Sequence, residues 1–251
     1  MFSPEVIATG GLVFAFEHAT PAGKLVLLLL AIGSIFSWSV MVTKLRVIQF
    51  ARKQNTRFLS AFRQDRQPLR LFEKNARFPG SPIFNVYRAA CQEITFQLLG
   101  SAEVDETFKA RLGIADKISA AQMGAVRAAM ERAVGETGLE LESQMILLAT
   151  AVSGSPFLGL LGTVWGVMDA FTGVAEAGAP NLAAMAPGVS GALITTVTAL
   201  CVAIPAMLGY NFLVTRIRGM IVEMDNFAGE LGSELEHKFV DHAVRESAFR
   251  R

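Results

Sequence analysis

Charged residues are absent from three long stretches of the chain, and these stretches define its architecture. The uncharged runs cover residues 25–43, 143–168 and 177–215. A helix needs about 20 predominantly apolar residues to cross the hydrocarbon core of a bilayer. The pattern therefore predicts three transmembrane helices, at 23–43, 146–170 and 188–214, and a loop at 171–187 between the last two.

Helical periodicity continues beyond the first and third spans. Apolar residues recur near helical spacing from Val47 to Phe62, and again from Ile217 to Leu231. A further helix is expected at 83–100, ending at Gly100. Another should begin after Ser119 and lead into the second span. The predicted fold class is an all-α membrane protein, with long cytoplasmic helical extensions within 44–145 and 215–251.

Lys and Arg are distributed asymmetrically around the spans. Residues 1–22 and 169–187 contain none, whereas residues 44–77 contain ten. Cytoplasmic flanks carry the excess of Lys and Arg in membrane proteins. The N-terminus is therefore predicted to be periplasmic and the C-terminus cytoplasmic. Residues 4–19 have apolar residues on one helical face but are too few to cross the bilayer. Residues 1–22 are therefore predicted to form a helix at the outer membrane–water interface.

Composition agrees with a membrane protein. The 251 residues are 52% hydrophobic, with a mean hydropathy of +0.41 and a net charge of +1. Membrane insertion already explains the basic segment 44–77, so nucleic-acid binding is not predicted. Binding of anionic lipid by the same segment is a second interpretation that stays open.

Residues with catalytic chemistry are scattered. Cys91 and Cys201 fall in different predicted regions, and His18, His237 and His242 have no metal-ligand spacing. No nucleophile–base pair or phosphate-binding loop is recognisable. The chain is therefore not predicted to be an enzyme, and no metal or cofactor is expected.

Small residues form a stripe along one face of each of the last two spans, at i, i+3, i+4, i+7 spacing. Membrane helices approach closely where such residues meet, because packing drives their association in lipid. The residues predicted to make these contacts are Gly159, Gly162, Gly166, Ala192, Ala199 and Ala203.

Hydroxyl residues lie on the same faces. Thr163, Thr195 and Thr196 either bond back to a carbonyl one turn earlier or line a hydrated path, and both interpretations are open. Asp169 is the acid closest to a span and is interpreted as a solvated residue at its outer mouth. A role as a buried proton carrier stays possible for an acid at this depth.

Three prolines interrupt the same segments. Pro187 fits a helix start, and Pro205 is expected to kink the third span. Pro156 is expected to break the second helix or to begin its membrane part.

Two segments have sequences that are characteristic of a known family. PFLGLLGTVWGVMDAF, at 156–171, and APGVSGALITTVTALCVAIPAMLGYN, at 186–211, together resemble the MotA/TolQ/ExbB proton channel family in its TolQ/ExbB branch. The similarity covers the three spans, their order and the large cytoplasmic insertion. The segment 23–42 and the residues 224–227 look more like TolQ than ExbB.

The resemblance implies a ring, a pentamer in this family, in the bacterial inner membrane. Its second and third helices would line a pore around a single-span TolR- or ExbD-like partner that carries a transmembrane aspartate. Proton flow would drive motion that reaches the outer membrane through a TolA- or TonB-like protein. Envelope constriction, outer-membrane import and gliding are all compatible processes.

The resemblance also assigns roles to residues. Thr163 and Thr196 match the pore threonines, with Thr195 and Ser190 as further hydroxyls on the path. Gly191 stands where many relatives carry glutamate. Because threonine does not titrate near neutral pH, the hypothesis is that the essential titrating group belongs to the partner. A non-conducting scaffold for that partner and a sodium-coupled stator are the alternatives.

Overall fold

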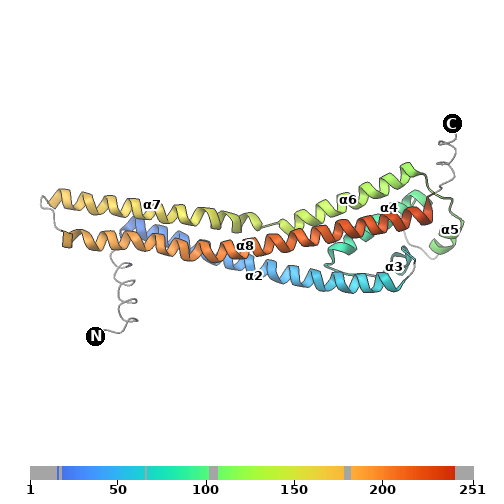
Figure 1. Cartoon of the computed structure of the whole chain (residues 1–251), viewed down its shortest axis with the longest axis horizontal. Helices are drawn as coiled ribbons and strands as arrows, with labels where there is room; N and C mark the ends of the chain where they lie inside the picture. Colours follow the sequence, from blue (N-terminus) through green and yellow to red (C-terminus); the bar gives the residue numbers. More distant parts are fainter. Residues whose placement is uncertain (1–15, 17–18, 66, 102–106, 178–181, 241–251) are drawn as a thin grey trace. The chain divides into compact units, whose positions relative to one another are not determined.

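The computed structural model describes residues 16, 19–65, 67–101, 107–177 and 182–240. These residues form a succession of helices, drawn in Figure 1: α2 (Pro21–Gln64), α3 (Arg70–Glu73), α4 (Pro82–Leu99), α5 (Phe108–Ile114), α6 (Ala120–Glu142), α7 (Met145–Ala177) and α8 (Leu182–Phe239). Helices α2, α7 and α8 are long and apolar enough to cross a membrane. The predictions of an all-α fold and three membrane helices are confirmed. The interfacial helix predicted within 1–22 falls almost entirely outside the described residues.

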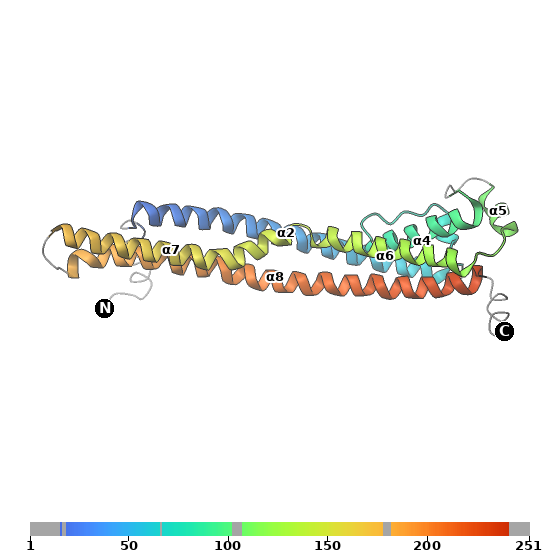
Figure 2. The same cartoon turned by 90° about the horizontal axis from the view of Figure 1, so that it is seen from above.

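The chain divides into two compact units. The first comprises Met1–Lys44 and Gln144–Leu213, and the second comprises Leu45–Ser143 and Val214–Arg251. In the first unit the early turns of α2 pack against α7 and α8, which lie side by side (Figure 2). Their shared core contains Val26, Leu30 and Ala199, with Leu158 and Val202 packed against it.

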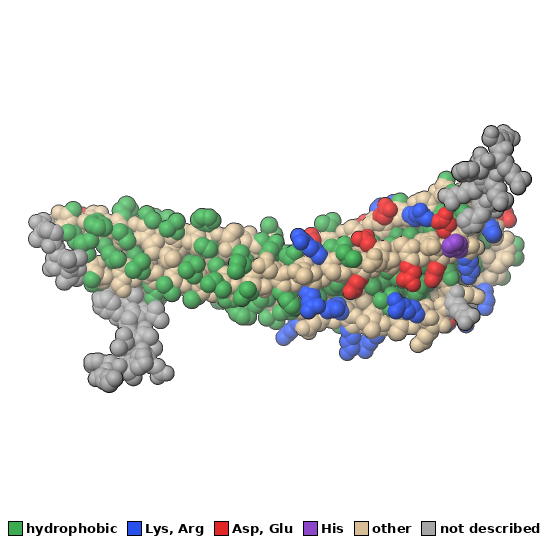
Figure 3. Space-filling view, in the orientation of Figure 1, with side chains coloured by type: hydrophobic (Ala, Val, Ile, Leu, Met, Phe, Trp, Pro, Cys, Tyr) green, Lys and Arg blue, Asp and Glu red, His purple; other side chains and the backbone are tan. Residues whose placement is uncertain are grey.

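The surface of the first unit is apolar. Bulky side chains point outward from all three helices: Phe36 is 63% exposed, Phe157 is 72% exposed and Leu208 is 63% exposed. On the face shown in Figure 3, hydrophobic side chains cover α7 and the beginning of α8. Exposing so large an apolar surface to water would be energetically unfavourable. It is suited to lipid or to neighbouring membrane helices.

An aromatic cluster forms the core of the second unit. Phe58 of α2 is completely buried and contacts Phe62, Phe84, Tyr87 and Phe227, with ring centroids 5.2–5.9 Å apart. These rings come from α2, α4 and α8, so the segments of α2 and α8 beyond the predicted spans pack around α4. The extension of α2 and α8 beyond their apolar segments, predicted from periodicity, is confirmed.

Local capping explains where α4 and α6 begin and end. Ser81 accepts a hydrogen bond from the Phe84 N–H at the start of α4, and Gly100 ends that helix in the left-handed region, with φ 70°. Ser119 and Gln122 form a reciprocal capping box at the start of α6. Both the end at Gly100 and the start after Ser119 agree with the sequence prediction.

The prediction of one helix from Ser119 into the second span is wrong. Helix α6 ends at Glu142, and α7 begins anew at Met145. Between them Ser143 is extended, with ψ 145°, and Gln144 is left-handed, with φ 65°. The Ser143 hydroxyl donates to the Glu140 carbonyl at 2.7 Å. Such a local side-chain bond offers the backbone an alternative to continuing the helix.

The three prolines lie inside continuous helices. Pro156 is within α7, and Pro187 and Pro205 are within α8. Pro156 therefore does not break the second helix, and Pro187 does not start the third, which begins at Leu182. In membranes, neighbouring helices compensate for the backbone bond that a proline removes. The predicted kinks stay predictions.

The connection between α7 and α8 is shorter than the predicted loop 171–187. Helix α7 continues to Ala177 and α8 begins at Leu182. The alanine-rich sequence on both sides favours helix. The residues between the two helices, 178–181, include the helix breakers Gly178 and Pro180.

Candidate functional site

The closest contact within the first unit is between α7 and α8, where three glycines face small residues. A Cβ added to Gly159 would stand 2.5 Å from Ala199 Cβ, and one added to Gly166 would stand 2.7 Å from Ala192 Cβ. A Cβ on Gly162 would meet Thr195 Oγ1 at 2.5 Å. Real Cβ atoms do not come this close, so only glycine permits this approach. The structure thus brings five of the six predicted packing residues together.

The sixth predicted packing residue, Ala203, is also buried. One turn before it, the fully buried Ala199 joins the core that α8 shares with α2. Further along the contact between α8 and α2, Gly209 of α8 packs directly against Met41 of α2. Small residues of α8 therefore pack against α7 on one side of the helix and against α2 on the other.

Three threonine hydroxyls converge on one backbone carbonyl, that of Gly159. Thr196 Oγ1 lies 3.1 Å and Thr195 Oγ1 3.0 Å from this oxygen. Thr163 Oγ1 lies 3.4 Å from it and 2.8 Å from the Leu160 carbonyl. The Thr163 and Thr196 oxygens are 3.5 Å apart. Close approach at Gly159 is what lets hydroxyls of α8 reach a carbonyl of α7.

These hydroxyls differ in their access to the surface. Thr195 is completely buried, and its hydroxyl is also 2.7 Å from the Ala192 carbonyl. It was predicted to lie on an ion path, but the structure places it inside the contact between α7 and α8. Thr163 and Thr196 are only partly buried. They are therefore the two threonines of this group that remain partly exposed at the surface of this chain.

The remaining predicted path residues lie nearer the start of α8. Ser190 is partly buried, whereas Gly191 is buried. A glutamate at 191 would thus bring a carboxylate into a packed region of this chain. Asp169 is partly buried within α7, two turns before that helix ends at Ala177. The helix therefore continues past the position predicted to be the mouth of the span.

Sequence reasoning missed the central acceptor of this site, because Gly159 was assigned to packing alone. The signal available was its position, four residues before Thr163, where a threonine bonds back to a helical carbonyl. The second contribution, from Thr195 and Thr196 of another helix, depends on how α7 and α8 pack. No spacing within one span reveals it.

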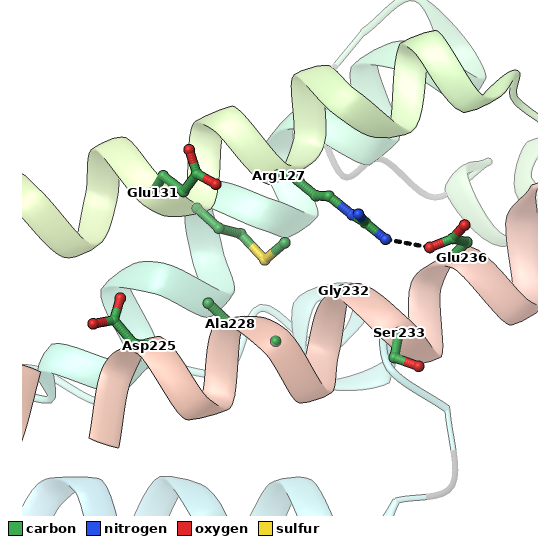
Figure 4. A pocket seen from close by; sticks show the side chains of 9 residues that line it. Arg127, Glu131, Asp225, Ala228, Gly232, Ser233 and Glu236 are labelled. Carbon is green, nitrogen blue, oxygen red and sulfur yellow. Dashed lines mark hydrogen bonds and ion pairs between the residues drawn. The ribbon is translucent and has the colours of Figure 1, made fainter. Parts of the chain in front are cut away.

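The second unit contains a separate groove between α6 and α8, shown in Figure 4. Arg127 of α6 forms an ion pair with Glu236 of α8 across it. Glu131 and Asp225 line the same groove, beside the small residues of α8. Within the described part of the chain, no group of three or more His, Cys, Asp or Glu residues is placed to hold a metal. The groove thus has the character of a helix–helix contact.

Known proteins resemble this chain over nearly its whole length. The model of the MotA/TolQ/ExbB proton channel family matches residues 100–226, about half of the chain. The Tol-Pal system protein TolQ of Pseudomonas aeruginosa is 30% identical over 237 residues, which are 94% of this chain and 96% of that protein. The chain belongs to the MotA/TolQ/ExbB proton channel family. The family model covers α6, the glycine contact and the three threonines.

Relatives of both branches match at similar identity. TolQ of Haemophilus influenzae is 30% identical over 225 residues, 89% of this chain and 92% of that protein. The biopolymer transport protein ExbB of Pseudomonas putida is 28% identical over 234 residues, 91% of this chain but 66% of that longer protein. The preference for TolQ over ExbB therefore stays a prediction. Family membership and three apolar helices together indicate an inner-membrane protein.

Proposed function

We propose that this chain is the stator subunit of an inner-membrane motor that couples the proton-motive force to work on the cell envelope. Family membership supports an energy-transducing role. The observation that carries the proposal is the pair Thr163 and Thr196, two accessible hydroxyls held 3.5 Å apart where α7 and α8 meet. The proposed topology is N-terminus periplasmic and C-terminus cytoplasmic.

The proton carrier is proposed to be an aspartate on a single-span partner similar to TolR or ExbD. Asp169 is the one acid within the predicted spans 146–170 and 188–214, and it is six residues from Thr163 along α7. Threonine does not change charge at working pH. Thr163 and Thr196 would therefore position the partner's carboxyl, in a pentamer of this chain that surrounds it. A TolA- or TonB-like protein would transmit the motion.

Proton flux across proteoliposomes that contain this chain and its partner tests the assignment. Thr163→Ala and Thr196→Ala are each expected to reduce flux about fivefold, the effect of losing one hydrogen bond of about 1 kcal/mol to the partner's carboxyl group. Thr198→Ala is the matched control, since that hydroxyl of α8 donates to the Ile194 carbonyl of its own helix. Full flux in both test variants would overturn the assignment.

The alternatives give different results in the same assay. A non-conducting scaffold, suggested by the buried Gly191 in place of a glutamate, predicts no flux for the wild type and a partner span without an acid. A sodium-coupled stator predicts flux that stops when sodium is removed. Native mass spectrometry of the purified protein tests the ring, for which five copies are expected.

A further inference from the structure

An open surface cavity of about 560 Å³ in the second unit is lined by the connection between α3 and α4 and by the first two turns of α4. Its charged lining residues are Arg77 and Arg88, and no carboxylate lines it. Both arginines are exposed, and neither pairs with an acid among the described residues. Nearby, by contrast, Asp65 pairs with both Arg70 and Lys74. The cavity thus concentrates two guanidinium groups that no acid of the described residues neutralises.

The wall of this cavity is held in place by α2. Gly80 has φ 77°, and a Cβ there would stand 2.5 Å from Cε1 of Phe50. Asn55 of α2 accepts hydrogen bonds from the Ser81 hydroxyl at 2.7 Å and from the Ile83 N–H at 3.3 Å. The connection is therefore fixed before any ligand arrives, which lowers the entropy cost of binding.

The chemistry of the lining matches a phosphate group. Guanidinium groups bind phosphate oxygens through paired, charge-assisted hydrogen bonds. Asn75 and Asn85 also line the cavity and supply amide donors. Phe78 provides an apolar wall beside them. We propose that this cavity binds the phosphate ester of an anionic ligand, and that the ligand is a phospholipid of the inner leaflet.

Position along α2 favours the lipid as the source of this phosphate. Phe50, which contacts the wall of the cavity, is seven residues after position 43, the predicted end of the first span. Seven residues of helix rise about 10 Å, and headgroups extend roughly 5–8 Å beyond the hydrocarbon core. Along α2, Phe50 is then at or just below headgroup depth. This placement rests on the proposed topology, whereas the phosphate chemistry does not.

Lipid binding to the full-length protein in neutral detergent, followed by native mass spectrometry, tests the proposal. Arg77→Gln/Arg88→Gln is expected to bind added phosphatidylglycerol about tenfold more weakly than the wild type. Arg132→Gln/Arg218→Gln is the matched control, because it removes two exposed arginines outside the basic segment 44–77 that do not line the cavity. It should bind as the wild type does. Equal losses in both double variants would overturn the cavity as the site.

A second arm titrates inorganic phosphate into the same proteins. Binding of phosphatidylglycerol but not of phosphate ion, lost only in the cavity variant, supports the lipid. Binding of phosphate ion alone, lost in the same variant, retains the phosphate site and rejects the membrane source. Each arginine is also replaced singly, so that a double variant that does not fold leaves the test intact. Proton flux is not a readout here, so failure of the stator proposal would not be mistaken for failure of this one.

Discussion

At the scale of single residues, Gly162 permits the close packing of α7 against α8. Replacing it with alanine would place a Cβ 2.5 Å from Thr195 Oγ1 and 2.8 Å from Thr195 Cβ. Gly162→Ala is expected to lower the free energy of unfolding by about 1–3 kcal/mol, the range for overpacking. Thermal unfolding in detergent measures this.

Gly154→Ala is the control for this substitution. It lies in the same helix, and a Cβ there would meet no atom within 4 Å. Alanine has the higher helix propensity, so this variant should be neutral or slightly stabilised. Equal destabilisation of both variants would mean that glycine is needed along α7 for reasons other than this contact.

Glu234 is expected to make the stability of the second unit depend on pH. Although Glu234 is exposed, desolvation by the surrounding protein, together with the neighbouring Glu230, raises the pKa of its carboxyl above its ordinary value. Its charged form is thus less favourable in the folded than in the unfolded state, and stability is lost as pH rises through the folded pKa. Glu234→Gln should raise the melting temperature at pH 7.5.

Below about pH 4 the advantage of Glu234→Gln should disappear, because glutamate is then largely protonated in both the folded and the unfolded chain. Melting curves of the wild type and the variant at the two pH values measure the difference. A variant that is less stable at pH 7.5 would indicate a favourable contact of the Glu234 carboxylate instead.

At the scale of helices, the break between α6 and α7 depends on one residue in an unfavourable conformation. Gln144 has φ 65°, which costs a residue with a Cβ about 1 kcal/mol. Gln144→Gly should therefore raise the free energy of unfolding by roughly 0.5–1 kcal/mol. Gln144→Pro should lower it, because proline cannot adopt a positive φ. Destabilisation by glycine as well would show that the glutamine side chain is needed there.

Helix ends were predictable where a local signal exists. Gly100 and Ser119 carry such signals, and the structure uses both. The break at Gln144 has none, since neither glycine nor proline is near it. At Pro156 and Pro187 the sequence predicted helix boundaries, whereas both prolines lie inside continuous helices. The rule for helices in water overstates the effect of proline in a membrane helix.

The candidate site was predictable only in part, for a related reason. Thr163 and Thr196 were found from residue type and family resemblance. The burial of Thr195 and of Gly191, and the role of the Gly159 carbonyl, arise from how two helices pack. The cavity combines Arg77, from a loop that has no periodicity, with Arg88 of α4. It depends on Asn55 and Phe50 of a distant segment.

At the scale of the whole molecule, the topology predicts which positions a membrane-impermeant maleimide can reach. Ser60→Cys and Glu176→Cys replace exposed residues of α2 and α7, in a chain whose Cys201 is replaced by alanine. In spheroplasts Glu176→Cys should be labelled, and Ser60→Cys should be labelled only after lysis. The reverse pattern would invert the proposed orientation.

Cys91 is kept in both labelling variants as an internal control. It is completely buried, and burial raises the pKa of its thiol. Since the thiolate is the reactive form, Cys91 should be labelled only after denaturation. Labelling of the parent chain before denaturation would mean that the second unit had opened, and would disqualify the preparation.

The three threonines around the Gly159 carbonyl also have a consequence for the charge of whatever enters the site. Each hydroxyl has one proton, and each proton has a backbone carbonyl within 2.7–3.1 Å to receive it. What the site offers an incoming group is therefore lone pairs. A protonated carboxylic acid can donate to them directly, whereas a carboxylate must first draw a hydroxyl away from its carbonyl, at about 1 kcal/mol. A difference of about 1 kcal/mol corresponds to roughly fivefold tighter binding of the neutral acid than of the anion. The contact between α7 and α8 would make this distinction with hydroxyl and carbonyl groups alone.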